Sequence, residues 1–488
     1  MNDGVAACCP SRICHGAQVT QSGYHRDAEF GSDHRSDPSA RAIIFRVQID
    51  RSNLSTLSIP LVVVLLTAAS AAQSPKGQSP RDETGDAVLL RELTADFDRL
   101  GPQTIRPADG YIKYPYLIPS GYYPQMWDWD GFFIGLHWAN QDPANATYLR
   151  DWVLSFAGSA DAEGYVAGCI TPKGPRPLFG KFAMKPFLAQ GALIAARDLK
   201  DYEWIRPVWP AMQRILDYRK RTQFDAKWGL WFWDNAMQSG ADNNAALTND
   251  PKDPSAILAV DASVWAMREY QAMAELATQL GDFNSARAYR AQALATRQAI
   301  MRQLYSPRDA MFWNRRRDDG EVIRVVAWSN FLPLIDGFLS RGEARRMIQL
   351  YLLDPAQMRA PHGIRSLSAF DRRYNNAAII NPYSNWRGPV WINANLLSWI
   401  ALRQYGFTSE AHWLAVTLAD DIHRDVERWG SMHEDYHAET GDGLAPTPDQ
   451  SPNGKFAGFV GWNLLAQDML QCEVTDQHCL KLSIINVQ

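Results

Sequence analysis

Apolar side chains recur at intervals of three and four residues along most of the chain after residue 86, with polar side chains between them. This spacing places the apolar side chains on one face of a helix. Strands are expected only as short pieces, such as the stretch "EVIRVVAW" at 321–328. The pattern predicts helices at residues 87–99, 131–139, 186–199, 207–221, 260–279, 283–304, 342–352, 390–404, 408–424 and 458–471.

These helices follow one another without a linker-like break, which favours one large α domain over several small ones. No repeat of about 30–45 residues is visible, which weighs against a solenoid of stacked repeats. A closed double ring of helices is therefore favoured. Its loops at one end would bring the aromatic-rich motifs of the chain together.

The N-terminal part of the chain has a different pattern. Residues 54–72, "LSTLSIPLVVVLLTAASAA", are apolar, follow Arg46 and Arg51, and end in small residues. This predicts a signal peptide, because the apolar core is shorter than the about 20 residues of a membrane span. Residues 1–53 are then a mis-assigned start or a disordered extension, 73–86 a linker, and 87–488 the folded domain. We expect an exported protein, periplasmic or secreted, with no membrane contact beyond an uncleaved signal anchor.

Three cysteines remain after the predicted signal peptide. In an oxidising compartment Cys472 and Cys479 can form a local disulfide, while Cys169 would be a buried free thiol. None of the three has the spacing of a metal site.

The composition of the chain limits the classes of ligand that it can bind. A formal charge of −4 over 488 residues offers no basic face to a phosphate backbone, which argues against a nucleic-acid partner. The 18 tryptophans are typical of sites that stack on sugar rings, although core packing accounts for about half of them. A small carbohydrate is the favoured partner.

The motif "SGYYPQMWDWDGFFIGLHWA" at 120–139 lies where a loop meets a predicted helix. Trp127 and Trp129 suit a sugar platform, and Asp128 and Asp130 suit acceptors of sugar hydroxyls. The alternative for Asp130 is an N-cap of the following helix.

Two further motifs carry polar groups among small or aromatic residues. "MQSGADNN" at 237–244 places Asp242 in an amide-rich loop with no cation beside it in the sequence. "NPYSNWRGPVWINANLL" at 381–397 places Arg387 beside Trp386 and before Trp391. Arg387 suits a sugar contact, and equally a clamp on a buried carboxylate.

A fourth motif matches a zinc-protease signature. His433, Glu434 and His437 in "HEDYH" have the H-E-x-x-H spacing, which needs a helix to place both imidazoles on one face. Gly430 lies just before the motif and "ETGDGLAP" follows it, and these residues disfavour a helix there. The sequence also offers no third ligand at the usual offset, so a zinc peptidase is only an alternative.

Six blocks of this chain, taken in order, resemble the glycoside hydrolase family 63 group. The group contains processing α-glucosidases and mannosylglycerate hydrolase, and it is related to the trehalases. The resemblance covers residues 110–470 and is carried by "GYYPQMWDWDGFFIGLHWA", "KPFLAQ", "SGADN", "NWRGPVWINAN", "EDYHAETGDG" and "FVGWNLLAQDML".

The resemblance implies an all-α fold, an (α/α)6 barrel of the six-hairpin glycosidase type, and inversion at an α-glycosidic bond without a metal or cofactor. It places the general acid on Asp242 and the general base on Glu434. The chain departs from many members of the group in having Gln238 where they carry Glu, which bears on substrate preference. The implied and candidate substrate-binding residues are Tyr123, Trp127, Asp128, Trp129, Asp130, Gln190, Gln238, Asn243, Trp386, Arg387, Trp391 and Trp462.

The chemistry of the two carboxyl groups agrees with these roles. Inverting hydrolysis needs one protonated and one ionised carboxyl, about 6.5–9.5 Å apart so that a water fits between. An acid near aromatic surface and away from cations has a raised pKa, as a proton donor requires. The sequence therefore predicts an inverting α-glycosidase acting on a short α-glucosyl or α-mannosyl compound. The rival predictions are the zinc peptidase and a catalytically silent sugar-binding protein.

Overall fold

The computed structural model describes residues 85–488 except 178–180, 248–255, 478 and 481–488. The predicted extension, signal peptide and residues 73–84 of the predicted linker lie outside the described residues. The first helix, α1 (Gly85–Leu100), begins two residues before the predicted domain start at Ala87. No helix among the described residues combines the length and the apolar character that crossing a membrane requires.

The helical periodicity is confirmed along most of the chain, while two α-helices, the four-residue α6 and the longer α3, have no counterpart among the predicted ones. The sequence of α3, "ATYLRDWVLSFAG", follows a short 3₁₀ turn after Asp142, and that aspartate accepts a hydrogen bond from the Ala144 N–H. The other α-helices are α2 (Asp128–Gln141), α4 (Leu188–Leu199), α5 (Trp209–Gln223), α6 (Ala236–Ser239), α7 (Val260–Gln279), α8 (Phe283–Gln303), α9 (Arg341–Met347), α10 (Ile392–Gln404), α11 (Thr408–Trp429) and α12 (Leu465–Thr475), with α3 at Ala146–Gly158.

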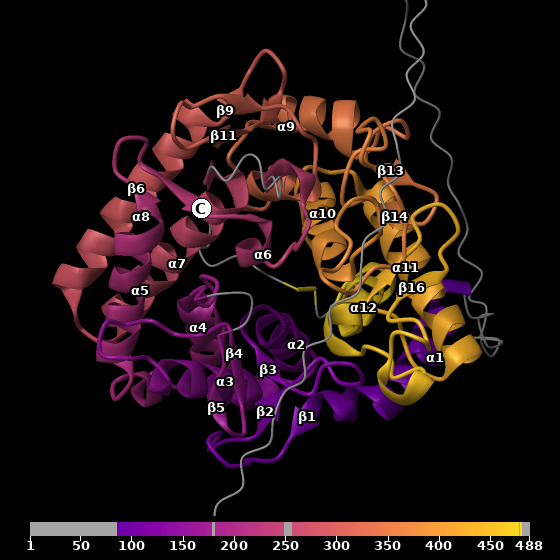
Figure 1. The fold of residues 1–488 in the computed structure, drawn as a ribbon, viewed down its shortest axis with the longest axis horizontal. Helices are drawn as coiled ribbons and strands as arrows, with labels where there is room; N and C mark the ends of the chain where they lie inside the picture. The colour runs from indigo at the N-terminus through magenta and orange to yellow at the C-terminus, as the bar shows by residue number, and fades with distance from the viewer. Residues whose placement is uncertain (1–84, 178–180, 248–255, 478, 481–488) are drawn as a thin grey trace, which may run out of the picture. The chain divides into compact units, whose positions relative to one another are not determined.

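The helices form two concentric rings (Figure 1). The inner ring runs through α2, α4, α7, the 3₁₀ helix η5 (Trp328–Asp336), α10 and α12, and each of these contacts the next. Helix α12 contacts α2 in turn, which closes the ring. Outer helices pack behind this ring, with α3 against α2 and α4, α8 against α7, and α11 against α10 and α12. The predicted closed double ring, an (α/α)6 barrel, is confirmed.

Inner helices are buried on nearly all sides, and this explains their composition. Most of α7 and α10 is buried, so they lack the polar face of a surface helix. Element η5 is a 3₁₀ rather than an α-helix and contains Pro333. A proline within a helix removes a backbone donor and clashes with the preceding turn, which accounts for the irregular form of this one inner element.

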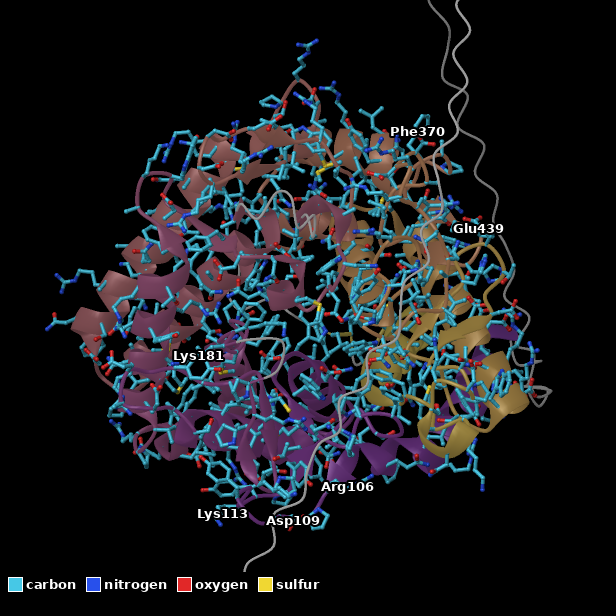
Figure 2. The ribbon with its side chains drawn as sticks, viewed as in Figure 1. Arg106, Asp109, Lys113, Lys181, Phe370 and Glu439 are labelled. Atoms are coloured by element: carbon cyan, nitrogen blue, oxygen red, sulfur yellow. A yellow bond between two sulfur atoms is a disulfide. The ribbon has the colours of Figure 1, made fainter. Side chains whose placement is uncertain are left out.

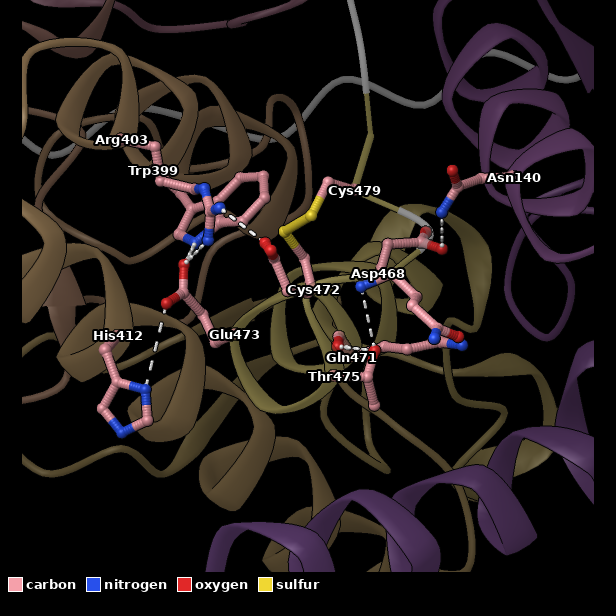
Figure 3. The surroundings of a disulfide bond; sticks show 12 residues. Asn140, Trp399, Arg403, His412, Asp468, Gln471, Cys472, Glu473, Thr475 and Cys479 are labelled. Atoms are coloured by element: carbon pink, nitrogen blue, oxygen red, sulfur yellow. Dashed lines mark hydrogen bonds and ion pairs between the residues drawn. A yellow bond between two sulfur atoms is a disulfide. The ribbon is translucent and has the colours of Figure 1, made fainter.

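Ring closure depends on polar contacts as well as apolar packing. Asp468 of α12 is fully buried and accepts hydrogen bonds from Asn140 (2.9 Å) and Gln141 (2.7 Å) of α2. Its other oxygen lies 2.8 Å from Nδ1 of His137. Figure 3 shows the contact between Asn140 and Asp468 beside the disulfide. One carboxylate thus joins the first and last inner helices.

The predicted disulfide between Cys472 and Cys479 is present, and it holds the segment after α12 against that helix (Figure 3). Cys169 is buried and not disulfide-bonded, as expected. Beside the disulfide, Glu473 accepts hydrogen bonds from Trp399 (2.9 Å) and Arg403 (2.7 Å) of α10. These contacts tie α12 to its neighbour in the inner ring.

Helix α4 obtains its N-terminal cap from another helix. Its own N-cap position, Phe187, provides no side-chain hydrogen bond. Glu269 of α7 instead accepts from the backbone N–H groups of Ala189 (2.7 Å) and Gln190 (3.3 Å). A carboxyl group at this end of a helix satisfies donors that have no partner within the helix.

The strands are short and lie in the loops between helices, and all their pairings are antiparallel. The largest sheet has the order β12-β11-β8-β7-β6, and the predicted strand at 321–328 forms only its edge, β12. The remaining strands make two- and three-stranded sheets. The strands are β1 (Ile105–Arg106), β2 (Tyr116–Leu117), β3 (Met126–Trp127), β4 (Cys169–Thr171), β5 (Gly174–Pro175), β6 (Phe224–Asp225), β7 (Leu230–Trp233), β8 (Ile257–Leu258), β9 (Tyr305–Ser306), β10 (Met311–Phe312), β11 (Asn314–Arg316), β12 (Val322–Ile323), β13 (Arg359–Ala360), β14 (Gly363–Ile364), β15 (Asp435–Tyr436) and β16 (Gly443–Ala445).

Candidate active site

A cavity of about 690 Å³ contains both carboxyl groups of the predicted catalytic pair. Asp242 and Glu434, which are far apart in the sequence, line the same cavity. The volume falls within the range of about 300–1,000 Å³ that small-molecule sites occupy. The predicted residues that line it are Tyr123, Trp127, Asp128, Trp129, Asp130, Asp242, Trp386, Trp391, Glu434 and Trp462.

A short helix and a glycine set the position of Asp242. Strand β7 leads through Asn235 into α6, and the Asn235 side chain accepts from the Gln238 N–H (3.2 Å) to cap that helix. Helix α6 ends after four residues at Gly240, whose φ of +90° favours glycine over residues with a side chain. Figure 1 shows α6 inside the ring of helices in that view. This turn places Asp242 at the wall of the cavity.

Asp242 is half-buried and held by Ser384. Its Oδ2 atom accepts from the Ser384 N–H (3.0 Å) and from the Ser384 hydroxyl (2.9 Å). Burial raises the pKa of Asp242, while these two donors and the positive charge of Lys185 lower it. The raised pKa expected for Asp242 is confirmed in direction. The expected separation from cations is wrong, because Lys185 lines the same cavity.

Glu434 precedes strand β15 and is fixed by contacts on both sides in the sequence. The preceding residue, His433, is anchored by Asp425, which accepts from its N–H (2.7 Å), and by Asn463, which donates to its carbonyl (2.6 Å). Tyr436 bridges to Val390 in front of α10. The carboxyl of Glu434 itself accepts a hydrogen bond from the Tyr123 hydroxyl. The base candidate therefore lies on extended backbone rather than on a helix.

The electrostatic surroundings of Glu434 strongly favour its neutral form. Burial raises the pKa of Glu434 well above its ordinary value, and the charges of Asp435, Asp130 and Asp242 raise it further. The Tyr123 hydrogen bond opposes this rise. Burial also raises the pKa of Asp130 to about 7, against the lowering effect of Lys185. The pKa of Glu434 is thus raised further above its ordinary value than the pKa of Asp242 is.

The tryptophans build the wall of the cavity by packing on one another. Trp386 and Trp391 stack face to face, with ring centroids 4.0 Å apart, and both are almost fully buried. Trp129 meets Trp386 edge to face at 6.1 Å, and Trp462 meets Trp391 at 5.9 Å. These four buried side chains line the cavity, and Trp127 is more exposed than they are.

Asp128 differs from the hydroxyl acceptor that the sequence predicts. It is almost fully buried and accepts from the backbone N–H groups of Trp129 (2.6 Å) and Lys185 (2.6 Å). The ammonium of Lys185 lies 3.1 Å from it. Asp130 is not the N-cap of α2, because the helix begins at Asp128 and Asp130 lies in its first turn. Asp130 lines the cavity instead.

Four predicted substrate-binding residues do not line this cavity, and each has a structural contact. Gln190 is fully buried and pairs with Arg268 and the Pro186 carbonyl. Gln238 accepts from the Asp234 N–H (2.7 Å) and borders only a smaller cavity of about 40 Å³.

The other two belong to the loop that supports Asp242. Asn243 is buried, accepts from the Trp386 N–H (2.6 Å) and donates to Asn385. Arg387 donates from Nε to the Asn243 carbonyl (2.9 Å). Arg387 is therefore a clamp on a backbone carbonyl, and neither of the two alternatives considered for it from the sequence describes this contact.

The "HEDYH" motif does not form the helix that a zinc signature needs. His433 and Glu434 precede β15 and His437 follows it. His433 Nδ1 lies 2.9 Å from Asp425, and His437 Nδ1 accepts from the Glu439 N–H. Among the described residues no group of three or more His, Cys, Asp or Glu side chains is arranged to hold a metal ion.

The structure adds cavity residues that the sequence analysis did not select. Lys185 is the first residue of the block "KPFLAQ" and Ser384 lies within the motif at 381–397, so both belong to motifs that the sequence analysis describes. Six others lie inside the motifs at 120–139, 237–244 and 381–397, where the more distinctive Trp, Asp and Arg side chains were chosen instead, and no motif contains Arg176, Ile380, Gln450 or Ser451. The added residues are Tyr122, Gln125, Arg176, Lys185, Met237, Gly240, Ile380, Asn381, Pro382, Ser384, Gln450 and Ser451.

A double ring of helices that encloses two carboxyl groups in an aromatic cavity defines the class of (α/α)6-barrel glycoside hydrolases. Comparison with known families agrees with this class. The profile described as "Mannosylglycerate hydrolase MGH1-like glycoside hydrolase domain" matches residues 123–452, about two thirds of the chain. The chain belongs to this family of glycoside hydrolases.

Individual relatives match over shorter stretches. A mannosylglycerate hydrolase of Rubrobacter radiotolerans is 30% identical over 139 residues, covering 28% of this chain and 30% of the relative. A probable mannosyl-oligosaccharide glucosidase of Schizosaccharomyces pombe is 28% identical over 164 residues, covering 31% of this chain and 18% of the relative. The chain thus aligns with less than a third of the length of these relatives.

The fold has counterparts among solved structures. The GH63 mannosylglycerate hydrolase of Thermus thermophilus, solved in complex with glucose, superposes with a TM-score of 0.59. The superposition covers 78% of this chain and 99% of that chain at 19% sequence identity. The two proteins therefore share their fold over nearly the whole described part of this chain.

Proposed function

We propose that this chain is an inverting α-glycosidase that hydrolyses a short α-glucosyl or α-mannosyl oligosaccharide or glycoside. The observation that carries the proposal is the presence of Asp242 and Glu434 in one aromatic-lined cavity of about 690 Å³. The names of the relatives, mannosylglycerate hydrolase and mannosyl-oligosaccharide glucosidase, support the substrate class.

Asp242 is the proposed general acid and Glu434 the proposed general base. In this mechanism Asp242 protonates the glycosidic oxygen while Glu434 removes a proton from the water that attacks the anomeric carbon from the opposite face. The bond from the anomeric carbon to the leaving oxygen breaks as the bond to water forms. The sugar product carries inverted configuration, and the proton removed from water remains on Glu434.

The proposed roles need a proton on Asp242 and none on Glu434, which is the reverse of the preference that burial and neighbouring charges give the two groups. One proton can be placed on either of the two carboxyl groups. The active form, with the proton on Asp242, is then the less populated of these two arrangements. Because the more acidic group titrates first, the acid limb of the pH–rate profile follows Asp242 and the alkaline limb follows Glu434. We expect the alkaline limb to lie well above the ordinary range of glutamate.

We also propose that the chain is exported. The support is the signal-like pattern at residues 54–72 and the disulfide between Cys472 and Cys479, because disulfides persist in oxidising compartments.

Two measurements test the proposed activity. A screen of α-gluco- and α-manno-disaccharides and of glycerate glycosides, followed by NMR of the first-formed sugar, should show turnover and an inverted anomer. Asp242→Asn and Glu434→Gln should each lower kcat by about 10²–10⁴-fold while a bound sugar still protects the protein against thermal unfolding. A retained anomer contradicts the inverting mechanism. Full activity in both variants contradicts the assignment of the pair.

The same experiments separate the two alternatives. A zinc peptidase would lose activity in a chelator and would cleave peptides, whereas we expect hydrolysis of glycosides to continue in a chelator. A silent sugar-binding protein would bind sugars and hydrolyse none of them. The positions of His433 and His437 outside a helix argue against the peptidase.

A further inference from the structure

Lys185 brings a positive charge into the cavity, close to the proposed acid. Its ammonium lies 3.1 Å from Oδ1 of Asp128, and its own backbone N–H donates to Oδ2 of the same carboxylate at 2.6 Å. The side chain is 15% exposed and lines the cavity. The lysine is therefore held at both ends by one aspartate.

The end of the Lys185 side chain packs against the loop that carries Asp242. A Cβ atom placed on Gly240 would lie 2.6 Å from Lys185 Cε and 3.4 Å from its Nζ. Gly240 precedes Asp242 by two residues, so the absence of a side chain at Gly240 allows the ammonium to approach this loop. The ammonium also lies 5.9 Å from the ring centre of Trp129.

Charged and titratable groups face this ammonium from several elements. Helix α2 contributes Asp128 and Asp130, and the loop after α6 contributes Asp242. Strand β4 contributes the Cys169 thiol, and the segment after β5 contributes Arg176, which is exposed. The charge of Lys185 lowers the pKa values of Asp130 and Asp242. Asp128 is its nearest partner and offsets part of its field.

We propose that Lys185 is a positioning residue of the active site, which acts through Asp242. With Asp128 as its partner, it supplies a positive charge beside the Asp242 loop, and this charge lowers the pH at which Asp242 gives up its proton. This inference deepens the proposed function and rests on it for the catalytic meaning of the Asp242 proton. The effect of the Lys185 and Asp128 charges on the pKa of Asp242 does not depend on whether the protein hydrolyses glycosides.

Two substitutions should move the titration of Asp242 in opposite directions. Lys185→Gln removes the positive charge, so the ionised form of Asp242 loses stabilisation and its titration midpoint should rise by about 1 pH unit. Asp128→Asn removes the negative partner and leaves the ammonium uncompensated, so the midpoint should fall. The acid limb of the pH–rate profile should move with the midpoint in each case.

Two control variants separate charge from structure. Lys185→Arg keeps the positive charge and should keep the wild-type midpoint. Lys181→Gln removes a lysine that lies over the Tyr165 ring and is not among the residues that line the cavity. Figure 2 marks the position of Lys181. It should leave both the profile and the midpoint unchanged.

The midpoint can be measured without turnover. In ¹³C spectra of protein labelled at the aspartate carboxyl carbon, the Asp242 resonance is the one that is missing in Asp242→Asn. Opposite shifts in Lys185→Gln and Asp128→Asn support the inference. If either variant does not fold, the sign of the shift in the other decides the outcome. An Asp242 midpoint that stays within about 0.2 unit of wild type overturns it. A wild-type protein that hydrolyses no α-glycoside overturns the proposed function instead, and the carboxyl titration still decides the charge relationship.

Discussion

The hydroxyl of Tyr123 donates a hydrogen bond of 3.1 Å to Oε2 of Glu434, across a sequence separation of 311 residues. It joins the loop before α2 to the segment before β15. Because the hydroxyl stabilises the ionised form of Glu434, it opposes the rise in the pKa of Glu434 that burial produces. This contact therefore supports the state in which Glu434 can accept a proton from water.

Replacing Tyr123 by Phe should raise the pKa of Glu434 and move the alkaline limb of the pH–rate profile upward by about 1 unit, since a hydrogen bond to a charged group contributes about 1.5–3 kcal/mol. At neutral pH the variant should lose about tenfold in kcat/KM, because fewer molecules carry an ionised Glu434. Steady-state rates between pH 4 and 10 test both effects. A uniform loss of rate with an unmoved limb would mean that Tyr123 contributes only to packing or to substrate contact.

Replacing Ser384 by Ala should move the acid limb instead. Ser384 donates twice to Asp242, and the substitution removes the hydroxyl donor while the backbone donor remains. The pKa of Asp242 should rise, so the acid limb should move upward. Ser384→Thr, which keeps a hydroxyl, should restore the limb. The Ser384 hydroxyl also accepts from Nε1 of Trp386, so Ser384→Ala should lower the free energy of unfolding by about 1 kcal/mol.

Buried carboxyl groups should make the protein less stable as the pH rises through neutrality. Burial raises the pKa of Glu269 from its ordinary 4.5 to about 7. The stability that this group contributes is complete below about pH 4.5 and is lost as the pH approaches 7, since the folded state binds the proton more tightly than the unfolded state does. Asp130, with its pKa raised to about 7, acts in the same direction.

Urea unfolding at pH 5 and pH 8 measures this effect. The free energy of unfolding should fall between these pH values, with about 2 kcal/mol of the fall due to Glu269. Glu269→Gln should show a smaller fall, because its side chain does not titrate. An equal fall in wild type and variant would show that Glu269 is not the group responsible.

Substituting Asp468 by Ala should destabilise the ring at its closure. The change leaves the donors of Asn140 and Gln141 and the contact of His137 without their buried acceptor. We expect a loss of about 3 kcal/mol or more in the free energy of unfolding. Asp420→Ala is the matched control, because Asp420 forms an exposed ion pair with Arg424, and it should cost less than about 1 kcal/mol. Similar losses in the two variants would argue against a special role for Asp468.

Sequence periodicity was sufficient for most of the helices and for the closed ring, because inner and outer helices alike must bury an apolar stripe. It missed α3, and it did not foresee that the inner element at 328–336 would be a 3₁₀ helix containing Pro333. Both lie next to loops in which local hydrogen bonds and a proline compete with the helical pattern.

The motifs located the cavity better than they assigned its individual residues. Trp127, Asp242 and Glu434 line it as predicted. Asn243 lies in the same motif as Asp242, and Gln190 lies in the block "KPFLAQ", but both side chains contact buried partners and do not line the cavity. A sequence motif shows which residue types occur close together in the sequence. The direction in which each side chain points depends on tertiary contacts with residues distant in the sequence. Lys185 shows the same limit, because only the fold places it near Asp242.

The closure of the inner ring through Asp468 also has a consequence for synthesis of the chain. Helix α2 leaves the ribosome more than three hundred residues before α12. The contacts of His137, Asn140 and Gln141 with the Asp468 carboxylate therefore form only when nearly the whole chain has been made. A nascent chain that ends before Asp468 exposes the face of α2 that α12 covers in the finished protein. Such a fragment is a candidate for chaperone binding, and the cavity can reach its final form only after translation is almost complete.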